Sequence, residues 1–205
     1  MRHLKLAVAS ATAVALLTAT PAALAATTHH PAPHSIGLRG GHTTVTTGKG
    51  IAAALLGAGI VPIAVAPGAE ALKPNLSAPA VSLTFPVTGG RVSLSPLHGS
   101  IAHRGGILFY DTATGKDVLV SNFVISLQHA DLTGIVNGNP KSRVALLNLS
   151  LAHAHLRVHG HVVDASNIGL SLTATAASAL DASLGTTLFT AGLALGTAST
   201  YLRLR

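Results

Sequence analysis

Short runs of alternating apolar and polar residues dominate the chain from residue 81 onward. Successive side chains of a strand point to opposite faces, so this alternation is typical of strands with one buried face. Turn-forming Gly, Asn, Asp and Pro separate the runs, which we place at residues 81–85, 92–94, 100–102, 107–110, 118–128, 131–136, 144–151, 153–158, 161–163 and 168–172. Many short strands at this spacing predict a mainly β protein, an antiparallel sandwich or a barrel-like sheet.

Turn-forming residues interrupt the first part of this alternating pattern. Gly89 and Gly90 separate two alternating runs, which predicts a β-hairpin at that point. Further upstream, the β-branched run at residues 43–47 and the apolar run at 60–65 predict two more strands. The Pro-containing stretch 67–79 predicts a loop.

Two Ala-rich segments predict short helices, at residues 49–56 and 175–184. Thr47 and Thr173 are suitably placed as N-caps, because a threonine hydroxyl can accept a hydrogen bond from a first-turn amide. Gly185 follows the second helix and predicts its end. The expected fold class is therefore mainly β with two short helices.

The N-terminus carries the pattern of a secretory signal peptide. A basic start precedes an apolar run at residues 6–17 and an Ala23-Leu24-Ala25 cleavage site, which predicts removal of residues 1–25. Residues 26–42 are polar and rich in His, Pro and Gly, and predict a disordered leader. One β-rich domain is expected over residues 43–205, in a secreted, extracellular protein for which association with the cell wall is an alternative left open.

Two later apolar segments, residues 51–66 and 188–202, are the candidates for membrane-spanning helices. Each is shorter than the roughly 20 residues that a helical span needs, and Gly, Pro or Thr interrupts it. We therefore expect no transmembrane span in the mature chain.

The distribution of charged residues indicates which classes of partner the protein can bind. The chain has a formal net charge of +7 and only 3% aromatic residues, and its basic residues are scattered. A nucleic-acid-binding protein usually shows a clustered basic face or aromatic stacking platforms, so no nucleic-acid partner is expected. Attraction to an anionic cell-wall polymer or another envelope component fits the charge better.

Cysteine is absent, which excludes disulfides, thiolate metal sites and thiol nucleophiles. Histidine, with 12 residues, is the remaining ligand type available in quantity. This composition leaves three alternatives open: a haem cofactor, a divalent metal, or no cofactor.

The densest group of potential ligands lies in residues 153–161, HAHLRVHGH. His153, His155, His159 and His161 share odd parity with an arginine, whereas the apolar residues between them share even parity. Two histidines one residue apart on a strand face can reach one metal ion, and a turn at 159–160 would fold the last histidine back beside them. The favoured interpretation is an ordinary exposed strand face, and a metal site is the alternative.

No catalytic signature occurs in the chain: nucleophile-elbow, zinc-protease, dinucleotide and phosphate-loop patterns are all missing. His103, Ser100 and Asp111 could form a triad only if the fold happened to bring them together. We therefore expect no enzyme, and a hydrolase with an unrecognised site ranks last among the functions considered.

One segment resembles a known family. Residues 99–108, GSIAHRGGIL, preceded by FPVTGG at 85–90, look like the G-S-[VI]…H-x-G-[GV]-L core of HtaA-type domains. Leu172-Thr173 and the later Gly192 are similar to the C-terminal pattern of that family, and the resemblance covers about residues 81–200. HtaA-type domains are secreted or surface β-rich domains of actinobacteria, and several of them bind haem.

The resemblance to HtaA-type domains supports a haem site only partly, because one motif of the haem-binding members is missing. Members that ligate haem through tyrosine carry a Trp- and Tyr-containing motif near the domain start, and this chain has no Trp and no Tyr before Tyr110. His103, by its place in the motif, and Tyr110 and Tyr201, by their chemistry, are the candidate haem contacts.

The expected function is that of a secreted, non-catalytic binding or structural domain of the cell envelope. The alternative is a haem or divalent-metal binding protein that uses the histidine-rich strand. Histidines gathered around a concave surface would favour the alternative, whereas a row fanned out into solvent would favour the first hypothesis.

Overall fold

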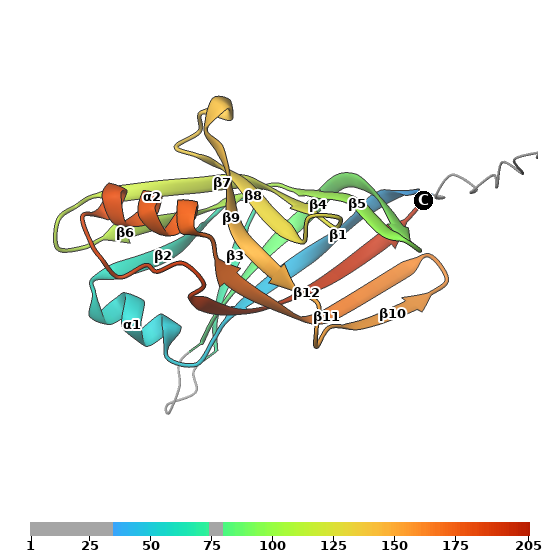
Figure 1. Cartoon of the computed structure of the whole chain (residues 1–205), viewed down its shortest axis with the longest axis horizontal. Coiled ribbons are helices and arrows are strands. Elements are labelled where there is room, and N and C mark those ends of the chain that lie inside the picture. Colours follow the sequence, from blue (N-terminus) through green and yellow to red (C-terminus); the bar gives the residue numbers. More distant parts are fainter. Residues whose placement is uncertain (1–34, 74–79) are drawn as a thin grey trace, which may run out of the picture. The chain divides into compact units, whose positions relative to one another are not determined.

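The computed structural model describes residues 35–73 and 80–205, which form an antiparallel sheet of twelve strands and two α-helices (Figure 1). The helices are α1 (Ile51–Gly57) and α2 (Ala174–Leu184), and a 3₁₀ turn, η1 (Pro140–Ser142), precedes the ninth strand. The strands are β1 (Ile36–Thr47), β2 (Ile60–Val65), β3 (Ala69–Lys73), β4 (Ala80–Leu94), β5 (Leu97–His103), β6 (Gly106–Asp111), β7 (Asp117–Ser126), β8 (Asp131–Val136), β9 (Arg143–Ser150), β10 (His155–His159), β11 (Val162–Leu172) and β12 (Ala194–Leu204).

Eight of these strands close into a barrel. Their order is β7, β5, β4, β1, β12, β11, β9 and β8, and β8 pairs again with β7. The other strands extend this ring: β6 and β2 continue from β7, β3 pairs with β4, and β10 pairs with β11. The predicted class, mainly antiparallel β with two short helices, is confirmed, and the barrel is the architecture observed.

The hairpin predicted at Gly89 and Gly90 is wrong. Both glycines lie inside β4, which runs as one strand and pairs with β1 and β5. A Cβ on Gly90 would collide with the backbone carbonyl of Ser100, so this glycine permits close strand pairing. The chain reverses later, between Leu94 and Leu97, which face each other at the start of the β4–β5 ladder.

The sheet also begins earlier than expected. Strand β1 starts at Ile36, so residues 36–42, which we expected in the disordered leader, pair with β4 and β12. The glycines in this stretch hide the strand in the sequence, because they carry no side chain that could show alternation. The predicted signal peptide and residues 26–34 lie outside the described residues.

The helices differ in how well the sequence predicted them. Helix α2 begins after Thr173, whose hydroxyl accepts a hydrogen bond from the Ala176 amide at 3.1 Å, and it ends at a left-handed Gly185, as expected. Helix α1 begins only at Ile51, and its N-cap is Gly50 rather than Thr47. The predicted loop at 67–79 contains strand β3.

The core fills the barrel from the inward faces of its strands. Its aromatic centre includes Phe85 and Phe123, whose rings meet edge to face with centroids 5.0 Å apart. A smaller cluster of Ile168, Leu170 and Ala198 lies on β11 and β12. Helices α1 and α2 lie at one end of the barrel, and the β10–β11 hairpin projects at the other end (Figure 1).

We predict that Gly41→Ala destabilises the fold strongly. Gly41 has φ +137°, and an added Cβ would collide with the carbonyl oxygen of Tyr201 on β12. A loss of at least about 2 kcal/mol of unfolding free energy is expected, measured by urea denaturation. Gly89→Ala is the matched control, because a Cβ there meets nothing within 4 Å. Equal midpoints for the two variants would contradict the prediction.

Candidate functional site

The histidine-rich segment forms the edge hairpin β10–β11. All five residues of β10 are exposed, and its register places Arg157 opposite Asp164 and His159 opposite Val162. The expected alternation is present, since His155, Arg157 and His159 lie on one strand face and Leu156 and Val158 on the other. The turn, however, falls at residues 160–161, one position later than the alternative considered from the sequence.

The structure does not assemble these histidines into a metal site. His153 lies in the turn before β10, and His161 lies in the hairpin turn, so neither belongs to the row formed by His155 and His159. Within residues 35–73 and 80–205, no three His, Cys, Asp or Glu side chains are grouped so that they could hold a metal ion. The described residues therefore place His155 and His159 on an exposed strand face, and a metal site that uses all four histidines stays a prediction from the sequence.

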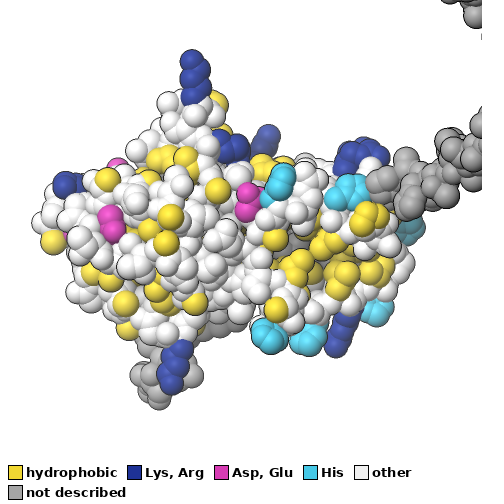
Figure 2. Space-filling view, in the orientation of Figure 1, with side chains coloured by type: hydrophobic (Ala, Val, Ile, Leu, Met, Phe, Trp, Pro, Cys, Tyr) yellow, Lys and Arg dark blue, Asp and Glu magenta, His cyan; other side chains and the backbone are white. Residues whose placement is uncertain are grey.

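The opposite face of β10 is apolar and uncovered. Leu156 is 53% exposed and Val158 is 49% exposed, so the rest of the described structure leaves about half of each side chain uncovered. Figure 2 shows hydrophobic side chains gathered over this end of the barrel, with histidines around them. We call Leu151, Leu156 and Val158, the exposed members on the β9–β10 side, the apolar patch.

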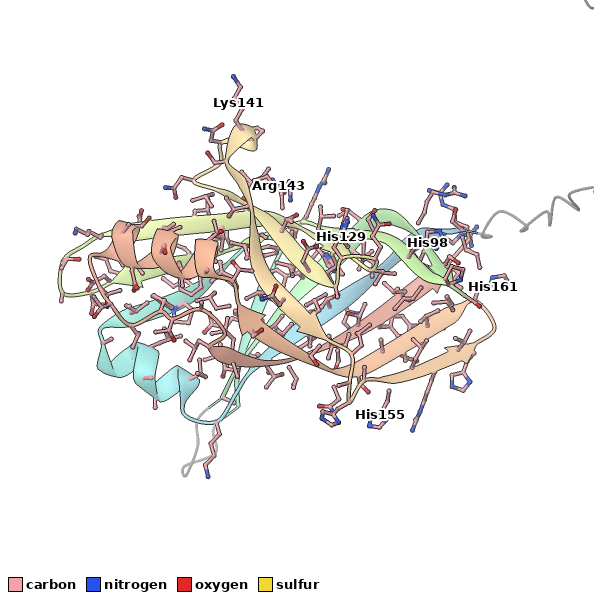
Figure 3. All side chains as sticks on the ribbon, viewed as in Figure 1. His98, His129, Lys141, Arg143, His155 and His161 are labelled. Carbon is pink, nitrogen blue, oxygen red and sulfur yellow. The ribbon has the colours of Figure 1, made fainter. Side chains whose placement is uncertain are left out.

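Four labelled histidines surround this region (Figure 3). His98 and His129 lie on the side of β5 and the β7–β8 turn, His155 lies on β10, and His161 lies at the hairpin tip. The Nδ1 atom of His98 is 3.0 Å from the Pro96 carbonyl, and the Nδ1 atom of His129 is 3.0 Å from the Ser126 hydroxyl. These contacts orient the two rings through Nδ1, so Nε2 is the ring atom with which each histidine could reach a ligand.

A second polar cluster lies on the outer face of β1 and β12. The rings of His42 and Tyr201 stack with centroids 5.5 Å apart, and the guanidinium of Arg203 lies 5.8 Å from the centre of the Tyr201 ring. Sequence reasoning missed His42, because it assigned this residue to the leader. Its only sequence signal is the β-branched run that directly follows it.

His103 is buried within the barrel. Its Nε2 atom is 2.8 Å from the Thr43 hydroxyl, which is in turn 3.0 Å from the Thr200 hydroxyl. Its Nδ1 atom is buried and has no hydrogen-bond partner among the described residues. Burial disfavours the charged ring and lowers the pKa of His103 to about 4, so the ring is neutral at neutral pH.

The second residue of the expected haem contact, Tyr110, lies elsewhere. Ile107 and Phe109 of β6 line the barrel interior together with His103, whereas Tyr110 is exposed on the alternate face of the strand. The structure therefore does not bring His103 and Tyr110 together, and His103 contacts threonines instead.

An apolar cavity of about 130 Å³ occupies the barrel next to His103. Side chains from both helices and from most barrel strands line it, and only Thr43, Thr47 and His103 among them are polar. The side chains of the described residues therefore leave part of the barrel interior unfilled.

The acidic residue expected near a triad has a structural role. The carboxylate of Asp111 accepts hydrogen bonds from the Ala113 amide at 2.8 Å and the Thr114 hydroxyl at 2.7 Å. The bond from Thr114 is the main cause that lowers the pKa of Asp111. This carboxylate organises the turn between β6 and β7, and His103 makes its side-chain hydrogen bond to Thr43.

A closed antiparallel barrel with two covering helices defines the class of fold, and neither described helix is long and apolar enough to cross a membrane. No protein-family model matches the chain, and no curated protein matches it. Among solved structures, the chain is similar to the C-terminal domain of HtaA from Corynebacterium glutamicum, with 18% identity and a TM-score of 0.55. The match covers 83% of this chain and 99% of that domain.

The N-terminal domain of the same HtaA matches less closely, with 12% identity and a TM-score of 0.45 over 80% of this chain and 97% of that one. The first match confirms the resemblance to HtaA-type domains at the level of the fold. This match covers 99% of the C-terminal HtaA domain, so the similarity extends over nearly all of that domain.

We predict that His103 makes the fold sensitive to acid. The unfolded ring has a pKa of 6.5 and the folded ring has a pKa of about 4, so between these values only the unfolded chain binds the proton. Stability is therefore lost as pH falls through this window, by up to about 3 kcal/mol. His103→Gln, which can still hydrogen bond Thr43, should flatten the pH dependence of the urea midpoint between pH 7 and 4.

The matched control is His155→Gln, which changes an exposed histidine. This variant should keep the pH dependence of the parent protein. If His103→Gln has the same dependence as the parent, the buried ring is not the group responsible.

Proposed function

We propose that this chain is an exported, non-catalytic binding domain of the cell envelope, and that the β10–β11 hairpin is its contact surface. The observation that carries the proposal is the apolar patch, in which Leu156 and Val158 stay about half exposed. Contiguous exposed apolar groups with a polar surround are typical of interaction surfaces. The predicted signal peptide and the HtaA-like fold support the same conclusion.

The hairpin offers two different faces to a partner. One face is the apolar patch, and the other carries His155, Arg157 and His159. Strand β10 pairs with β11 only, among the described strands, so its outer backbone groups are available for further pairing. The polar face suits an anionic cell-wall polymer as the envelope partner, because the chain without residues 1–25 keeps 11 of its 13 Lys and Arg (Arg2 and Lys5 are removed) against 6 Asp and Glu.

Haem binding is the second candidate function, and a specific arrangement favours it. Haem is a flat, largely apolar ring with two carboxylates, so it requires an apolar surface, basic groups at the rim and a ligand for iron. The apolar patch provides the first, Arg157 lies on the other face of the same strand, and His98 and His129 offer Nε2 atoms as candidate ligands for iron. HtaA-type domains, several of which bind haem, make this ligand the first to test.

We predict saturable haemin binding at one molecule per chain, followed by the Soret band of the purified protein. Leu156→Asp with Val158→Asp should weaken it at least about tenfold, because two apolar contacts of about 1.5 kcal/mol or more are lost. Leu56→Asp is the matched control, since Leu56 on α1 is also 53% exposed but lies at the opposite end of the barrel.

Two further variants separate the possible ligands. His98→Ala with His129→Ala should shift the Soret band if these rings ligate iron, whereas His153→Ala with His155→Ala should shift it if the histidine strand does. A featureless titration would overturn the haem function. In that case, sedimentation with isolated cell walls, compared between the parent protein and the Leu156, Val158 variant, tests the envelope function alone.

A further inference from the structure

We propose that the apolar cavity inside the barrel is a second binding site, for an uncharged apolar molecule about the size of a single aromatic ring. The cavity of about 130 Å³ lies between the inward faces of the strands and helices α1 and α2. Cavities of similar size lined by Leu, Ile and Phe stay dry and bind ligands such as benzene. This site is independent of the function proposed above.

The lining excludes water and charged ligands. A buried water needs about two to four polar partners, and the polar groups at this cavity are mostly occupied. The hydroxyl of Thr43 contacts both His103 and Thr200, and the Thr47 hydroxyl accepts a hydrogen bond from the Val81 amide at 3.0 Å. Only the Nδ1 atom of His103 has no partner, and it is buried in a neutral ring.

The aromatic side chains around the cavity favour a flat ring as its occupant. Phe85 and Phe123 meet edge to face, and Phe109 and Phe189 also meet edge to face with centroids 6.4 Å apart. All four line the cavity, which gives a further ring several edges and faces to pack against. An aromatic guest could therefore extend an arrangement that the core already uses.

The cavity and the apolar patch are separate surfaces. None of the patch residues Leu151, Leu156 and Val158 lines the cavity. Residues Ile51 and Leu55 of α1 and Ala176 and Leu180 of α2 cover it at the end of the barrel away from the hairpin (Figure 1). A variant in the cavity can therefore be tested without altering the patch.

The test uses benzene as the probe and the purified full protein. Benzene should raise the melting temperature in a saturable manner and shift the methyl resonances of cavity-lining Leu, Ile and Val residues. Val120→Phe places a ring in the cavity and should weaken benzene binding at least tenfold. Val118→Ile is the matched control, because Val118 is buried on the same face of β7 but does not line the cavity.

A second variant keeps the test valid if Val120→Phe does not fold. Leu180→Ala enlarges the cavity and should admit naphthalene, which the parent protein should exclude. Absence of any benzene-dependent shift, or shifts that Val120→Phe and Val118→Ile reduce equally, would overturn the proposal. Haemin binding should be the same in the parent protein and in Val120→Phe. A negative result for benzene in the cavity therefore does not affect the test of haemin binding at the apolar patch, and the reverse also holds.

Discussion

Closure of the sheet by the β7–β8 pair is the constraint on which the rest of the structure depends. Strand β7 pairs with β8 from Val120 to Ser126, and this contact joins the two ends of the eight-stranded order into a ring. Closure pairs the backbone groups of the barrel strands and creates an interior that can bury His103. It also sets the volume that the inward side chains must fill, and they leave a cavity.

The same closure separates the molecule into two chemical regions. The end covered by the helices contains an apolar cavity, which suits a small uncharged guest. The end with the β10–β11 hairpin exposes apolar side chains beside His and Arg, which suits a larger ligand or surface with negative charge. The two proposed sites therefore require ligands of different size and charge, and they lie on different elements of one barrel.

Local patterns predicted several elements and failed at identifiable residues. Strands β2 and β8 and helix α2 follow their sequence signals closely, because alternation and a threonine cap act over a few residues. The glycines of β1 and β4 were interpreted as leader and turn. Their role is to let strands approach closely, as the clash expected at Gly41 shows, and this role depends on a partner strand distant in sequence.

The sequence by itself determined the β class, the two-faced pattern of β10 and the absence of cysteine chemistry, since each follows from residue type and local period. Tertiary structure decided which residues meet. It placed His42 against Tyr201, separated Tyr110 from His103, and put His153 and His161 in turns on either side of the strand that carries His155 and His159. These outcomes depend on strand order and register over long sequence separations, and no local period of the chain encodes them.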